Sequence, residues 1–160
     1  KFSVKAINVP LEGGEVNLID EEEEYEKVKT IVNDIAEEEN IHISLLPGKV
    51  MSGDDAIKEI EKITQTNIPD LFVIDMIDQK KNEPLAGVRV IKKIKAKNEL
   101  KDIPLLIYTK LNEKDFNDLV SPALRKGVEW EEDENNRVAT AKDRETLIRE
   151  MVKRIYERGG

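Results

Sequence analysis

An uninterrupted apolar run that ends in an acid, Leu71-Phe72-Val73-Ile74-Asp75, is the feature that most constrains how this chain can fold. Continuous hydrophobicity is typical of a strand buried on both faces, as in parallel sheets covered by helices. Two other runs end in polar residues: Val16–Ile19 leads into Asp20-Glu21, and Leu105–Tyr108 leads into Thr109. As parallel neighbours, these strands would bring three acids and a hydroxyl to the sheet edge where α/β proteins bind ligands.

Strand-like and helix-like patterns alternate along the chain. Strands are expected at Val16–Ile19, Ile41–Leu46, Leu71–Ile74, Pro104–Tyr108 and Val138–Thr140, and amphipathic helices at Tyr25–Ile35, Ala56–Ile63, Val88–Ile94, Phe116–Gly127 and Leu147–Ile155. Since crossovers between parallel strands are right-handed, the pattern predicts an α/β, flavodoxin-like doubly wound sheet of five parallel strands in the order 2-1-3-4-5. Residues 15–160 form the predicted domain, and residues 1–14 are expected to be an N-terminal extension, a linker or an extra edge strand.

Two details of the pattern carry expectations of their own. Pro122 lies inside the fourth helical segment, and we expect the helix to kink or split there because proline cannot donate a backbone hydrogen bond. Trp130 stands among acids in the turn-rich stretch before the last strand, and we expect it to anchor that loop.

Composition excludes several classes of function. The 160 residues contain no cysteine and one histidine, which excludes disulfides, cysteine nucleophiles and multi-histidine zinc sites. A formal net charge of −8 argues against a nucleic-acid surface. No apolar stretch reaches the roughly 18 residues that a membrane helix needs. We therefore expect a cytoplasmic domain with neither a membrane nor a nucleic acid as partner.

Three segments make the sequence resemble a known family. Asp70–Asp75 resembles the third strand of response-regulator receiver domains of two-component signalling, Ala86–Ile91 resembles the glycine-led start of their third helix, and Ile103–Thr109 resembles their fourth strand. The resemblance spans roughly residues 15–158.

The resemblance implies a phosphorylation site. Asp75 would be the phosphoacceptor, Thr109 and Lys142 would contact the phosphoryl group, and Mg²⁺ would be held by Asp20, Glu21, Asp75 and the backbone carbonyl of Ile77. Mg²⁺ takes oxygen ligands and offsets the charge that develops during phosphoryl transfer. The phosphodonor would be a histidine kinase or a phosphotransfer protein, and the output a homodimer or a separate protein. Activity as an enzyme would be limited to self-phosphorylation and slow self-dephosphorylation.

Other readings remain open. Lys110 beside the hydroxyl, Ala139 where the family usually has an aromatic residue, and the long loop after Asp75 favour a pseudo-receiver, a protein-interaction module that needs no phosphorylation. Asp20-Glu21 could serve only the dipole of the helix that they open, and Thr109 could cap the next helix, as Asn112 also could. A Mg²⁺-dependent phosphotransferase or nuclease of another α/β family is a third alternative.

Overall fold

A computed structural model of the chain describes residues 2–9, 18–40, 43–46, 53–64, 68–76, 86–109, 112–127, 130–140 and 144–157. The strands are β1 (Phe2–Val9), β2 (Ile43–Leu46), β3 (Leu71–Met76), β4 (Leu105–Thr109) and β5 (Asn136–Ala139). The helices are α1 (Leu18–Glu38), α2 (Gly53–Glu61), α3 (Ala86–Ala96), the consecutive segments α4 (Glu113–Asp115), η1 (Phe116–Val120) and α5 (Ser121–Gly127), and α6 (Arg144–Glu157). Among these residues no helix has the length and apolar character needed to cross a membrane.

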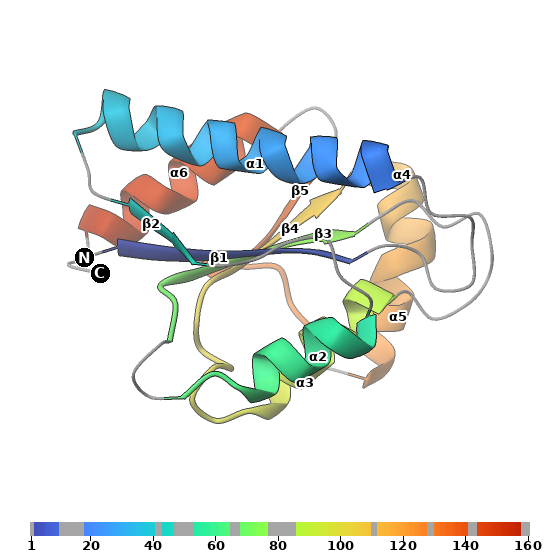
Figure 1. Ribbon diagram of the computed structural model, residues 1–160. Helices are drawn as coiled ribbons and strands as arrows, with labels where there is room; N and C mark the ends of the chain where they lie inside the picture. Colours follow the sequence, from blue (N-terminus) through green and yellow to red (C-terminus); the bar gives the residue numbers. More distant parts are fainter. Residues whose placement is uncertain are drawn as a thin grey trace.

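All five strands form one parallel sheet in the order β2-β1-β3-β4-β5. This confirms the predicted flavodoxin-like topology and four of the expected strands, with β5 starting two residues earlier than Val138. The carboxyl ends of β1, β3 and β4 point to the same edge of the sheet (Figure 1).

The identity of the first strand was predicted wrongly. Leu18 and Ile19 of the expected strand begin α1, and the strand in its place is β1, from the segment that we expected to be an extension or linker. β1 is an inner strand and not an edge strand, since it pairs with both β2 and β3. Lys5, in its middle, is buried, and its Nζ lies 3.7 Å from Glu59 of α2. The expected boundary between residues 14 and 15 lies outside the described residues.

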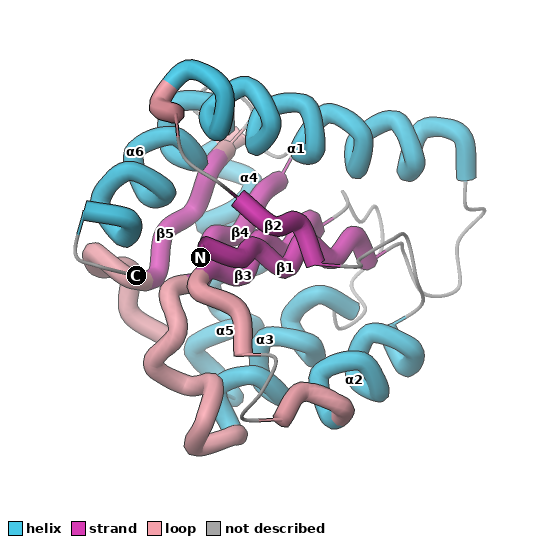
Figure 2. The backbone as a smooth tube through the Cα atoms, turned by 60° about the vertical axis from the view of Figure 1, so that its left-hand side comes forward, coloured by secondary structure: helices cyan, strands magenta, loops and turns pink. Residues whose placement is uncertain are grey.

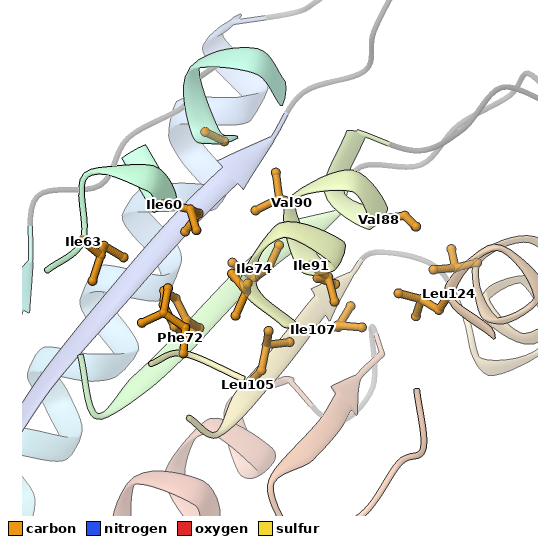
Figure 3. Packing of buried hydrophobic residues seen from close by; sticks show 14 of the residues in the cluster. Ile60, Ile63, Phe72, Ile74, Val88, Val90, Ile91, Leu105, Ile107 and Leu124 are labelled. Carbon is orange, nitrogen blue, oxygen red and sulfur yellow. The ribbon is translucent and has the colours of Figure 1, made fainter. Parts of the chain in front are cut away.

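Two apolar clusters cover the two faces of the sheet. On one face, α2, α3 and the α4–α5 segment pack on Phe72, Ile74, Leu105 and Ile107, which Figure 3 shows among the helix side chains. On the other face, α1 and α6 pack on Val4 and on the alternate residues of β3 and β4. Figure 1 shows α1 and α6 on one side of the sheet and α2, α3 and α5 on the other. Residues 71–74 of β3 and 105–108 of β4 are therefore buried on both faces of the sheet, as their continuous hydrophobicity predicts.

The helical segment that carries Pro122 does not stop at the proline. It passes through a wide turn, η1, in which the backbone N–H of Ser121 donates to the carbonyl of Phe116, five residues earlier. The wider turn shifts the hydrogen-bond register just before Pro122, so the helix continues to Gly127 although proline donates no bond. The expected split at Pro122 is therefore replaced by a π segment.

Side chains of two helices, α3 and α6, bind the acidic segment before β5 and the start of β5. Nζ of Lys95 in α3 donates to Oδ1 of Asn136 at 2.6 Å and lies 6.0 Å from the centre of the Trp130 ring. Trp130 packs against the first apolar cluster, which confirms the predicted loop anchor. On the other side, Arg154 of α6 bonds to Glu134. These contacts hold the start of β5 against β4.

The place of β1 in the sheet can be tested with Val4, which is fully buried. Val4→Asp is expected to lower the free energy of unfolding by about 4 kcal/mol or more, because it buries an unpaired charge between β1 and α1. Urea denaturation followed by circular dichroism measures the change. Val4→Ile, which changes the side-chain volume but keeps it apolar, is the control. A loss below about 0.5 kcal/mol, as for a surface residue, would contradict an inner β1.

The contacts of Lys95 with Asn136 and Trp130 can be tested through the pKa of Lys95. Burial lowers the pKa of Lys95 from its usual 10.5, against the opposing effect of Asp133 and Asp102. Between the folded-state pKa and 10.5 this residue binds more protons in the unfolded chain, so the contribution of Lys95 to the free energy of unfolding rises with pH across that window. Lys95→Met should lack this rise. Urea midpoints measured from neutral pH to 10.5 compare the two proteins, and parallel curves would contradict the burial of a charged Lys95.

Candidate functional site

The register of the three inner strands sets the candidate site. Asp75 on β3 pairs with Asn8 on β1 and with Tyr108 on β4. One residue further, Met76 pairs with Val9 and with Thr109. The carboxyl ends of β1, β3 and β4 therefore bring Asn8, Asp75 and Thr109 to one edge of the sheet, as the sequence predicted for Asp75 and Thr109. This is the edge where open α/β sheets bind ligands.

The acid pair expected at the end of the first strand is not there. With β1 ending at Val9, the residues level with Asp75 and Met76 are an amide, Asn8, and an aliphatic side chain, Val9. Asp20 and Glu21 belong instead to the first turn of α1. The prediction that they follow the strand directly is wrong, because it rested on taking the first residues of a helix for a strand. Whether they bind a cation is not tested by this placement.

Two other predicted site residues cannot be placed. Ile77, whose carbonyl was expected to ligate Mg²⁺, and Lys142, expected to contact the phosphoryl group, both lie outside the described residues.

Thr109 does not cap the helix that follows β4. The helix after β4 is capped by Asn112, whose Oδ1 accepts a hydrogen bond from the backbone N–H of Asp115 at 2.8 Å. Asn112 is thus the N-cap residue, and Thr109 is the last residue of β4. The alternative that Thr109 caps this helix is therefore not what the structure shows, and Thr109 ends β4 at the level of Met76.

A large residue on β4 pairs with a small one on β5. Tyr108 is fully buried in the cluster under α1 and α6, and its partner on β5 is Ala139, also fully buried. The aromatic side chain is therefore on β4, directly before Thr109, and not on β5. β5, Asn136–Ala139, carries no aromatic residue.

The donors at this edge can be compared with the needs of Mg²⁺, which the resemblance implies. Asn8, Asp75 and Thr109 all carry oxygen, the donor atom that Mg²⁺ prefers, but only Asp75 is charged. Within the described ranges no group of three or more histidine, aspartate or glutamate side chains could hold a metal ion. Oxygen donors of this kind fit a hard divalent cation.

Comparison with solved structures agrees with this architecture. The chain is similar to the receiver domain of a histidine kinase from Clostridium thermocellum, with 16% identity, 96% of each chain covered and a TM-score of 0.54. It is also similar to the receiver domain of the sensor histidine kinase PA1611 from Pseudomonas aeruginosa, described with a magnesium ion coordinated in its active-site cleft. That match has 13% identity, covers 96% of this chain and 97% of the other, and has a TM-score of 0.52.

A third similar structure is the receiver domain of a signal transduction histidine kinase from Syntrophus aciditrophicus, with 17% identity, 94% and 88% of the two chains covered and a TM-score of 0.51. No protein-family model and no curated protein sequence matches the chain. The chain has the fold of response-regulator receiver domains, at a level of identity that shows the fold alone.

Asn8 offers a direct test of the site. Asn8→Asp is expected to strengthen the binding of Mg²⁺ or Mn²⁺ by roughly tenfold, the effect of one added charge close to a divalent ion near a protein surface. Isothermal titration calorimetry measures the affinity. Ser3→Asp, at the other end of β1, adds the same charge far from Asp75 and is the matched control. Equal effects of both substitutions would mean that β1 does not flank a cation site.

Proposed function

We propose that this chain is a signalling receiver that accepts a phosphoryl group on Asp75. The observation that carries the proposal is the register that places a carboxylate and a hydroxyl, Asp75 and Thr109, at the ends of two neighbouring inner strands. The similarity of the fold to receiver domains supports it. The phosphodonor is a histidine kinase or a phosphotransfer protein.

The proposed reaction transfers a phosphoryl group from a nitrogen atom of the donor protein to Asp75. A carboxylate oxygen of Asp75 forms a bond to phosphorus while the bond between phosphorus and the donor's nitrogen breaks, and the donor keeps that electron pair. Thr109 donates a hydrogen bond to a phosphoryl oxygen, and the ammonium of Lys142 pairs with another. Bound Mg²⁺ supplies charge neutralisation between the two anions. Hydrolysis of the acyl phosphate by water returns the carboxylate and ends the signal.

The proposed cation ligands come from more than one element. Asp75 and the carbonyl of Ile77 contribute from β3 and the residue that follows it, and Asp20 and Glu21 contribute from the start of α1, directly or through water. In the receiver structure from Pseudomonas aeruginosa a magnesium ion is coordinated in the cleft, which supports a divalent cation here.

The output is a change in protein association. Phosphorylation adds a charge of about −1.5 to −2 at the sheet edge, next to Thr109 and the helix that begins after Asn112. A local charge of this size biases a two-state arrangement of the adjoining segments. We propose that this change controls a homodimer or a separate output protein in the cytoplasm, without nucleic acid or membrane as a partner.

A second candidate function is a phosphorylation-independent interaction module of the same fold. The observation that favours it is that Asn8 and Val9, not acids, are level with Asp75 and Met76. In that case Asp75 would be a polar strand end without phosphoryl chemistry.

Intact mass spectrometry after incubation with acetyl phosphate separates the two candidates. The wild type is expected to gain one phosphoryl group in the presence of Mg²⁺ and none with a chelator. Asp75→Asn should abolish the adduct because it removes the nucleophile, whereas Asp78→Asn, the matched control three residues away, should keep it. An unmodified wild type over a wide range of Mg²⁺ concentrations would contradict the receiver and leave the interaction module.

A further inference from the structure

Lys95 of α3 carries a half-buried amino group that takes no part in the proposed phosphoryl transfer. Its Nζ donates to Oδ1 of Asn136 at 2.6 Å and to the backbone carbonyl of Lys101 at 3.1 Å. The centre of the Trp130 ring lies 6.0 Å from the same Nζ. Because Asn136 begins β5, this cluster lies at the amino ends of the parallel strands, at the opposite end of the sheet from Asp75.

The position of β5 depends on the contacts of its first residue, because this strand is short and lies at the edge of the sheet. It has four residues and pairs with β4 alone, and Figure 2 shows it next to α6. The backbone N–H of Asn136 donates to Oδ1 of Asp133 at 2.9 Å, and its carbonyl accepts from the N–H of Asp133 at 3.0 Å. The side chain of Asn136 accepts from Lys95. A change in the amino group of Lys95 therefore acts directly on the start of β5.

Two opposing effects act on the charge of Lys95. Burial disfavours the ammonium and is the larger effect, whereas the carboxylates of Asp133 and Asp102 favour it, so the pKa of Lys95 is lowered from its usual 10.5. A lysine with a lowered pKa has more of the neutral amine at a given pH than an ordinary exposed lysine. The neutral amine is the form in which lysine acts as a nucleophile.

The geometry around Nζ also suits the neutral amine. A neutral amine has two N–H groups and one lone pair, and the two acceptors, Oδ1 of Asn136 and the carbonyl of Lys101, match the two N–H groups. The lone pair is then left for an electrophile. Since Lys95 is half-buried and not fully enclosed, it leaves access for a small reagent, and the half-buried ring of Trp130 provides an apolar surface beside it.

We propose that Lys95 is a site of covalent acylation by small acyl phosphates, and that acylation releases the start of β5 from α3. In this reaction the lone pair of Nζ forms a bond to the acyl carbon while the bond between that carbon and the phosphate oxygen breaks. Phosphate leaves with that electron pair and takes up the proton that the nitrogen loses. The resulting amide is uncharged and has one N–H, so it cannot donate to both Asn136 and Lys101, and the attraction of a cation to the Trp130 ring is lost.

Limited reaction with acetyl phosphate, followed by peptide mass spectrometry, tests the reactivity of Lys95. A chelator removes Mg²⁺, and acetyl and phosphoryl adducts are told apart by their mass. Lys95 is expected to gain an acetyl group at least about threefold faster than the exposed Lys114 and Lys126, because burial favours its neutral form. A rate at Lys95 no higher than at these two lysines would identify it as a structural anchor only and would overturn the proposal.

Trp130 reports the structural consequence, because it is the only tryptophan in the chain. Its fluorescence emission is expected to shift to longer wavelength in step with acetylation of Lys95, as the ring becomes more exposed to water. Lys95→Gln, which replaces the ammonium by an uncharged amide, should give the same shift without reagent, whereas the matched control Lys114→Gln should not. Unchanged Trp130 emission in protein that is acetylated at Lys95 would overturn the release of β5.

Asp75→Asn separates this reaction from the proposed phosphoryl transfer. The variant lacks the proposed phosphoacceptor and is expected to be acetylated at Lys95 at the same rate as the wild type, because the two residues lie at opposite ends of the sheet. A wild type that is acetylated at Lys95 but never phosphorylated would contradict the receiver and leave this proposal in place. An acetyl adduct on Lys95 that requires Asp75 would overturn its direct reaction with the acyl phosphate.

Discussion

The pairing of β3 with two parallel neighbours is the constraint on which the candidate site depends. Each residue from Val73 to Met76 has a partner on both β1 and β4. A shift of either neighbour by one residue would turn its side chains to the opposite face. The two apolar clusters prevent that shift, because alternate residues of β3 and β4 are buried under different helices. Packing on both faces thus fixes the levels of Asn8, Asp75 and Thr109.

The sequence predicted most of this fold because the strands β3 and β4 are continuous apolar runs and the helices have clear faces. It failed at the first strand, where Val16–Ile19 looks like a strand when read alone. Leu18 stands seven residues before Tyr25, in phase with the apolar face of α1, and Phe2–Val9 alternates as a strand does. Those two signals favour Phe2–Val9 as the first strand. Choosing between the two candidate strands requires knowing which one pairs with β2 and β3.

The candidate site was predicted only in part for the same reason. Asp75 and Thr109 follow from the strands that carry them, since a strand end is visible in a single sequence. The partner level with Asp75 follows from pairing between distant segments, and there the structure has Asn8 and not an acid. One neutral side chain in this position lowers the negative charge around Asp75. Compared with an acid in this position, it would weaken both the attraction for a cation and the repulsion of an anionic group.

The nuclear magnetic resonance spectrum of the ¹⁵N-labelled protein with beryllofluoride, a mimic of a phosphoryl group on aspartate, tests the central claim most directly. In the presence of Mg²⁺ the amide signals of Asn8, Asp75 and Thr109 are expected to shift together, with the changes extending into the helix that follows Asn112. The same addition to Asp75→Asn should leave the spectrum unchanged. A wild-type spectrum that does not respond to Mg²⁺ and beryllofluoride would contradict phosphoryl chemistry at Asp75.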